Sequence, residues 1–140
     1  SAKSRGVDID NIRFDNINVD CKDLIRIQFG YASETKIQNL YFSGISGTVL
    51  GTSILAGKPG NALKNIHISD FSIDLSGQEY FMEAIDVEKL IMRDVCINGK
   101  LPKIGLQNVV GLQANNCQPE PRNMSDEEVR ELDRIRKRLY

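Results

Sequence analysis

The chain has little of what metal centres, disulfide scaffolds and membrane spans are built from. It contains one His and three Cys among 140 residues. The cysteines are odd in number and lack C-x-x-C spacing, which argues against a disulfide framework or a thiolate metal site, so we expect Cys117 to pack in the core. No run of about 18 apolar residues occurs, which argues against a membrane-spanning helix. We therefore expect no cofactor and no metal.

An excess of charge of one sign is also missing. Lys and Arg total 18, Asp and Glu total 19, and the net charge is −1. With no basic face, neither nucleic acid nor a membrane surface is an expected partner. The 41% apolar content suits a single globular domain. Since the chain opens on Ser1 without an initiator Met, we expect a processed or excised product.

What the sequence does have is a repeat. Apolar residues at offsets 0, 3, 5 and 8 recur five times, starting at residues 9, 37, 63, 87 and 109. The starts lie 28, 26, 24 and 22 residues apart, which is the range of solenoid repeats. The first occurrence is strong and comprises Ile9, Ile12, Phe14 and Ile17. The last is weaker and comprises Val109, Leu112, Ala114 and Cys117.

The offsets predict strands separated by corners. Offsets 3 and 5 keep the period of a strand, whereas the three-residue steps on either side break it and require bends. Residues that favour such bends occupy offset 2, namely Asn11, Asn39 and Asn65, and offset 7, namely Asn16, Gly44, Asp70, Asp94 and Asn116. At equivalent corners of successive coils, the three Asn of offset 2 would stack about 4.8 Å apart and form a hydrogen-bonded ladder.

These features predict an all-β fold, a parallel β-helix of about four to five coils over residues 1–117. The stretches between repeats carry no helical apolar stripe, so turns join the strands. The rival solenoid is the leucine-rich repeat, which wants Asn at the ninth position. This chain instead has Ile17, Ile45, Phe71, Val95 and Cys117 there.

After the coils the sequence changes character. Residues 118–124 contain two prolines and predict a connector. Residues 125–140 predict an amphipathic helix, with Ser125 and Glu128 as a capping box and an apolar stripe of Val129, Leu132, Ile135 and Leu139. We expect this helix to cap the last coil by covering its open edge; the alternative is packing against a second copy. Because its composition differs from that of the coils, the cap is interpreted either as a natural capping helix or as an appended, engineered one.

One outward-facing column carries candidate binding residues. Offset 4 places Arg13, Tyr41 and His67 in line, followed by Ile91 and Gln113. A guanidinium can pair with a uronate carboxylate and an aromatic ring can stack on a sugar, so the column predicts a site for an anionic glycan. Lys58 and Arg26 are predicted to extend it. The alternative is an ordinary solvated sheet face.

A pair of carboxylates in adjacent coils also invites comparison with a glycosidase. Asp70 and Asp94 share offset 7, which would place them about one strand spacing apart, near the separation used by retaining enzymes. The same column holds residues suited to a tight bend, so we interpret both as corner residues.

Two segments carry a family resemblance. They are residues 9–17, IDNIRFDNI, and residues 51–66, GTSILAGKPGNALKNI. Residues 9–117 resemble the later coils of polygalacturonase-like glycoside hydrolases of family 28, in the pectin-lyase-like superfamily. The resemblance implies a right-handed parallel β-helix, a secreted or periplasmic location, and a pectic or other anionic polysaccharide as partner.

The resemblance also implies inverting hydrolysis by Asp residues, a His and an Arg-x-Lys pair. This chain departs from that pattern. It has no Asp-Asp pair, its only His follows Ile66 rather than Gly, and Arg26-Ile27-Gln28 has Gln in place of Lys. Asn18-Val19-Asp20 lacks the Gly-Ile that follows the family's Asn-x-Asp. We therefore predict no catalytic residues in this chain. It resembles the C-terminal coils of such an enzyme without the coils that carry the catalytic residues.

Three functions fit the sequence: a glycan-binding portion without turnover, a hydrolase with a displaced site, and a structural or self-associating solenoid. The prediction of self-association depends on the first coil of the solenoid. Residues 1–6 are too short and polar to cover it, so the strand edge around residues 9–17 is predicted to pair with another chain.

Overall fold

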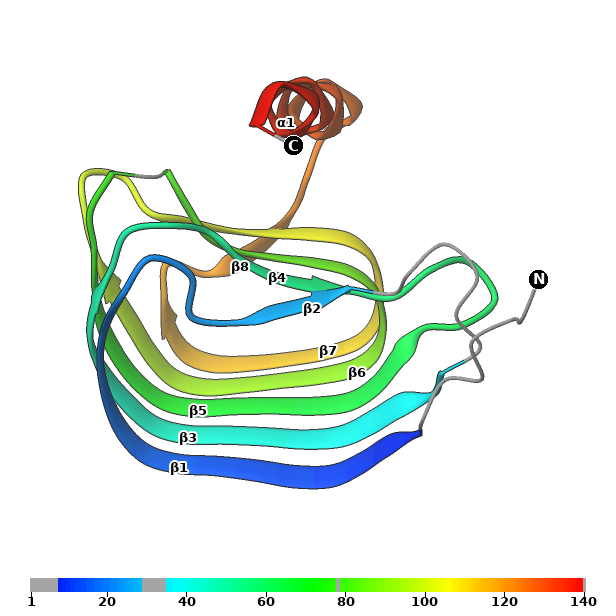
Figure 1. Ribbon diagram of the computed structural model, residues 1–140, viewed down its shortest axis with the longest axis horizontal. Helices are drawn as coiled ribbons and strands as arrows, with labels where there is room; N and C mark the ends of the chain where they lie inside the picture. Colours follow the sequence, from blue (N-terminus) through cyan, green and yellow to red (C-terminus); the bar gives the residue numbers. More distant parts are fainter. Residues whose placement is uncertain (1–7, 29–34, 78, 140) are drawn as a thin grey trace.

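The repeats fold into the strands that their offsets predict. The computed structural model describes residues 8–28, 35–77 and 79–139, with side chains of the last helix as far as Arg134. Parallel strands stack coil upon coil into a β-solenoid of about four turns, which confirms the predicted fold class (Figure 1). In chain order the elements are β1 (Ile9–Cys21), β2 (Arg26–Gln28), β3 (Ile37–Val49), β4 (Ser53–Ala56), β5 (Leu63–Leu75), β6 (Tyr80–Asn98), β7 (Lys103–Gln118), β8 (Pro121–Asn123) and α1 (Asp126–Leu139).

Each coil has a long side and a short side. The long side is built by β1, β3, β5 and the later parts of β6 and β7, which pair in that order. The short side is built by β2, β4, the first parts of β6 and β7, and β8. Pairing joins equal offsets of successive coils, so that Ile12 lies opposite Leu40 and Leu40 opposite Ile66. The repeat therefore sets the register directly.

The core lies between the two sides and is open at both ends. Offset 3 illustrates this: Leu40, Ile66 and Leu90 in the middle coils are 2%, 0% and 0% exposed. In the terminal coils the same offset is occupied by Ile12 and Leu112, which are 38% and 37% exposed. A coil is buried only where another coil lies on each side of it.

At the predicted corner positions the backbone adopts the left-handed conformation. Asn11, Asn39 and Asn65 each have a φ of 56°, a region that Asn tolerates because its short side chain can hydrogen-bond locally. Offset 7 has positive φ in all five repeats, at Asn16, Gly44, Asp70, Asp94 and Asn116. A third corner column, which the sequence did not predict, consists of Asp86 and Asn108, with φ of 52° and 53°.

The corner side chains form the predicted ladder in part. Asn65 Nδ2 donates to Asn39 Oδ1 at 2.6 Å. The next rung differs from the prediction, because Asn39 Nδ2 donates to Asp10 Oδ1 at 2.8 Å rather than to Asn11. Gln38 Nε2 also donates to Asp10, to its Oδ2 at 3.0 Å, and the bonds from Gln38 and Asn39 hold the pKa of Asp10 below its ordinary value, with Gln38 contributing the largest effect. The other corner columns have equivalent rungs, from Asn108 to Asp86 and from Asn116 to Asp94.

The predicted connector contains a short strand. Residues Pro121–Asn123 form β8, which pairs with Ile104–Leu106 of β7 on the short side. A proline is tolerated here because β8 is an edge strand, where one side of the backbone needs no ladder donor. The coils therefore extend slightly further than residues 1–117.

The C-terminal helix is present with the predicted cap. Glu128 N–H donates to Ser125 Oγ at 3.1 Å, and Ser125 N–H donates to Glu128 Oε1 at 3.2 Å. The Tyr80 hydroxyl donates to the other Glu128 oxygen, which ties the first turn to the short side. Burial, followed by this bond, raises the pKa of Tyr80, whereas the bond from Tyr80 lowers the pKa of Glu128.

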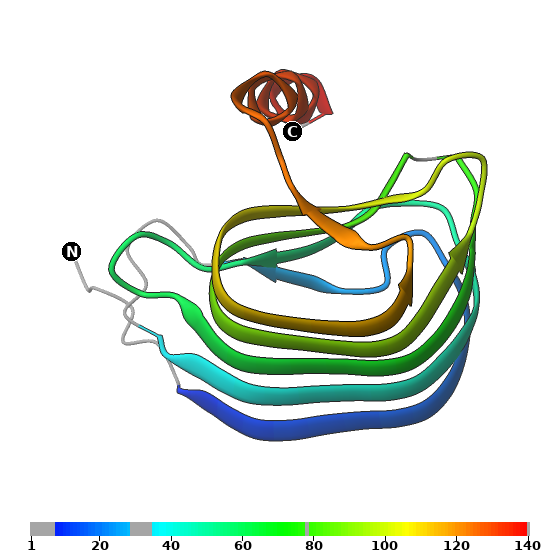
Figure 2. The same cartoon turned by 180° about the vertical axis from the view of Figure 1, so that it is seen from behind.

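The expectation that the helix covers the last coil is wrong. Figures 1 and 2 show α1 beside the coils, outside their outline. Leu112, at an inward offset of the last coil, is 37% exposed. The cause lies at the root of the helix, where Met124 lies against Gly105 and Tyr80 holds Glu128. These contacts fix the helix to the short side and leave the end of the long side open.

Candidate functional site

The structure brings together the three leading residues of the offset 4 column. Arg13, Tyr41 and His67 come from β1, β3 and β5, and each lies directly opposite the next in the strand register. The Arg13 guanidinium carbon lies 4.3 Å from the centre of the Tyr41 ring. The centres of the Tyr41 and His67 rings are 4.8 Å apart, with planes inclined at 33°. We call Arg13, Tyr41 and His67 the outward stack.

The stack corrects one part of the expected binding mode. Arg13 and His67 approach Tyr41 from neighbouring strands on opposite sides, so both faces of the Tyr41 ring are occupied. A sugar therefore cannot stack on this ring as the sequence suggested. The contact with the Tyr41 ring holds the Arg13 guanidinium at this surface. Its planar fork of N–H donors has the geometry that a carboxylate accepts.

His67 is held in place from its own strand. Its Nε2 lies 2.7 Å from Asn65 Oδ1, the amide that also donates to Asn39 in the corner ladder. Partial burial lowers the pKa of His67, and the positive charges of Lys89 and Arg13 lower it further. The ring is therefore neutral at neutral pH and gains its charge only in more acidic solution.

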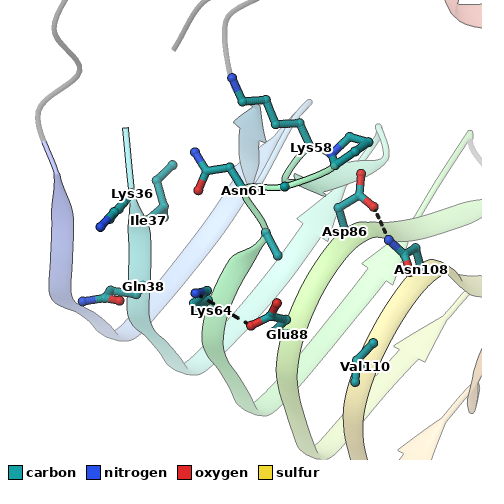
Figure 3. Close-up of a pocket in the computed structure, with 13 residues that line it drawn as sticks. Lys36, Ile37, Gln38, Lys58, Asn61, Lys64, Asp86, Glu88, Asn108 and Val110 are labelled. Atoms are coloured by element: carbon teal, nitrogen blue, oxygen red, sulfur yellow. Dashed lines mark hydrogen bonds and ion pairs between the residues drawn. The ribbon is translucent and has the colours of Figure 1, made fainter. Parts of the chain in front are cut away.

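A separate groove lies around the corner from the outward stack. It has a volume of about 430 Å³ and is bordered by the loop that carries Lys58 and Asn61 (Figure 3). Lysines and carboxylates both line the groove, and Lys64 Nζ lies 3.9 Å from Glu88 Oε2 on the neighbouring strand. Asp86 accepts a hydrogen bond from Asn108 at 2.5 Å on the same wall. The mixed charge makes this groove a weaker anion site than the stack.

The remaining predicted binding residues lie apart from the stack. Lys58 borders the groove, and Arg26 lies on β2 of the short side, where its Nη1 is 3.7 Å from Asp23 Oδ2. The structure therefore joins three of the five predicted residues and separates the other two. Asp70 and Asp94 have left-handed backbone, as expected for corner residues.

Sequence reasoning missed two cations that share the face of the stack. Lys89 takes the corner position that Asn holds in the first three coils, with a φ of 64°, and its charge acts on His67. Arg93 lies two offsets from the column and its Nε is 3.9 Å from Asp94 Oδ2. Reading the corner and neighbouring columns for charge would have found both.

Other site chemistry is sparse in the described part of the chain. Across residues 8–28, 35–77 and 79–139, no three His, Cys, Asp or Glu side chains gather as metal ligands would. Nor is any described helix long and apolar enough to cross a membrane. The three cysteines are free thiols; Cys21 and Cys117 pack against the core, and burial raises the pKa of both.

Comparison with known proteins found no relative of this chain. No family model, no curated protein and no solved structure matches this chain. The β-solenoid fold therefore rests on the structure itself, and function has to be argued from the surface that the coils present.

Proposed function

We propose that this chain binds an anionic, uronate-containing polysaccharide along the outward stack and does not cleave it. The observation that carries the proposal is the placement of the Arg13 guanidinium on the Tyr41 ring, 4.3 Å from its centre. A guanidinium presents a fork of donors whose geometry matches a carboxylate. The contact with the Tyr41 ring holds that fork at the surface of the solenoid. The resemblance of the coils to polygalacturonase-like enzymes points to the same class of polymer.

The spacing of the stack suits a repeating ligand. Arg13 and His67 lie two strands apart, which corresponds to about 9.6 Å along the solenoid axis. A polymer with regularly spaced carboxylates can meet both groups at once. The absence of the family's Asp-Asp and Gly-His motifs from the sequence supports binding without turnover.

Removal of the stack is expected to weaken this binding. In the combined variant Arg13→Ala, Tyr41→Ala, His67→Ala we expect affinity for polygalacturonate to fall at least about tenfold, because a charge-assisted hydrogen bond is worth about 1.5 to 3 kcal/mol. Affinity electrophoresis or retention on the immobilised polymer measures the change. The control Arg26→Ala also removes one cation, but from the short side, and should bind as the wild type does. Equal losses in both variants would indicate non-specific charge attraction.

Binding is also expected to strengthen in acid. Because the pKa of His67 is lowered in the free protein, the ring is neutral at about pH 7 and becomes charged only as the pH falls below its ordinary range. A bound carboxylate favours the charged ring, so affinity should rise between about pH 7 and about pH 5, where uronates stay ionised. His67→Gln should flatten this rise. An unchanged slope in that variant would remove His67 from the site.

A further inference from the structure

The two ends of the solenoid expose matching apolar rows. The first-coil row consists of Ile9, Ile12, Phe14 and Ile17, with exposures of 36%, 38%, 42% and 37%. The last-coil row consists of Val109, Leu112, Ala114 and Cys117, which are all half-buried or exposed. Both rows have the offsets 0, 3, 5 and 8 that every buried row of the interior has. Each row therefore lacks a neighbour that the rest of the fold provides.

The rows fit each other in the register already used inside the chain. Equal offsets pair between successive coils, as in Ile9 with Ile37 and Val87 with Val109. Continuing that rule would place Val109 opposite Ile9 and Leu112 opposite Ile12 of a second copy. At offset 5 the small Ala114 would face the large Phe14, whose ring is already stacked on Phe42 at 5.2 Å within its own chain.

The corner ladder gives this stacking a direction. In the rungs Asn65 to Asn39, Asn108 to Asp86 and Asn116 to Asp94, the residue of the later coil donates and that of the earlier coil accepts. A second copy placed with its first coil on the last coil would let Asn16 donate to Asn116 in the same sense. Two first coils placed face to face would reverse one of the chains and break this pattern.

The strand order at the two ends also matches. Within the described residues, five long-side segments alternate with five short-side segments, the last of which is β8. The next positions are thus a long strand above β7 and a short strand above β8, which are the places that β1 and β2 of another copy would take. The helix does not obstruct them, because it lies beside the coils (Figure 2).

We propose that copies of this chain associate head to tail, the first coil of one docking on the last coil of the next through these two rows. Such an interface is heterologous, so it adds further copies and produces filaments rather than closed dimers. The partner is a second copy, because the surface offered is a strand edge with a matched apolar row. The proposal does not depend on glycan binding.

Charge substitutions at opposite ends test the proposal. Ile12→Lys blocks the first coil, Leu112→Lys blocks the last coil, and both side chains are exposed in the single chain, so each variant should fold as the wild type does. Sedimentation velocity over a concentration series should show growing assemblies for the wild type, and electron microscopy should show filaments. Each variant alone should stay monomeric. Their equimolar mixture should form a dimer and nothing larger, since one intact interface remains.

The control Leu50→Lys removes an apolar side chain that is 52% exposed in a turn, and it should assemble as the wild type does. A wild type that is monomeric at about 100 μM would overturn the proposal. So would self-association of Leu112→Lys alone, which would indicate pairing of two first coils or of two helices. A mixture of the two variants that stays monomeric would equally contradict head-to-tail docking.

Discussion

Replacement of Leu90 by Ala is expected to lower the free energy of unfolding by about 3 to 5 kcal/mol. Leu90 is fully buried in the middle of the core, with Ile66 on the coil before it and Leu112 on the coil after it. Both neighbours are fixed by strand pairing, so the coils cannot collapse into the cavity. Urea unfolding monitored by circular dichroism measures the loss.

The matched control is Leu112→Ala, the same substitution at the same offset one coil later. Leu112 is 37% exposed, so its truncation should cost about 1 kcal/mol or less at protein concentrations where the chain is monomeric. The contrast isolates burial from residue type. Equal losses at the two positions would contradict the account of an interior core with an open end.

Replacement of Gly47 by Ala is expected to destabilise the fold by about 3 kcal/mol or more. Gly47 has a φ of 133°, and a Cβ built there would lie 1.9 Å from the Val19 carbonyl oxygen of the neighbouring strand. That oxygen is main chain and belongs to the ladder, so it cannot move aside without breaking the pairing of β1 and β3. Thermal unfolding should show the loss as a large fall in Tm.

Gly60→Ala separates the clash from the backbone strain. Gly60 also has positive φ, 80°, but no atom lies within 4 Å of the position of its Cβ. Strain alone should cost about 1 to 2 kcal/mol. If Gly60→Ala were as damaging as Gly47→Ala, the close approach of the strands at Gly47 would not be the cause.

Much of the fold could be predicted because one pattern specifies both strand and corner. The inward offsets and the Asn and Asp corners repeat in every coil, so a weak single-repeat signal becomes strong when it recurs. The Asp86 and Asn108 corner escaped prediction because it occurs in only two coils, where no loop separates the short side from the long side. A pattern seen twice does not stand out from chance.

The position of the helix could not be predicted, although the helix itself could. Ser125 and Glu128 form a local signal that the backbone obeys. Where the helix docks depends on Tyr80, which lies 48 residues away in the sequence and whose hydroxyl donates to Glu128. A contact of that range leaves no periodic trace in the sequence.

The candidate site, like the helix, could be predicted from the sequence only in part. The repeat placed Arg13, Tyr41 and His67 in one column, and the strand register bears this out. It did not reveal that the side chains stack upon one another, which changes the available surface from a ring face to a fork of guanidinium donors. Side-chain stacking depends on rotamers, and offsets alone do not specify them.

The most direct test of the central claim is a single experiment on polygalacturonate that follows both retention of the protein and release of reducing ends. Binding without cleavage predicts that the wild type is retained, that salt elutes it, and that no reducing ends appear. Release of reducing ends would contradict the account and would require a catalytic carboxylate on these coils. Failure of the wild type to be retained would equally contradict it and would leave the outward stack as an ordinary solvated face of the solenoid.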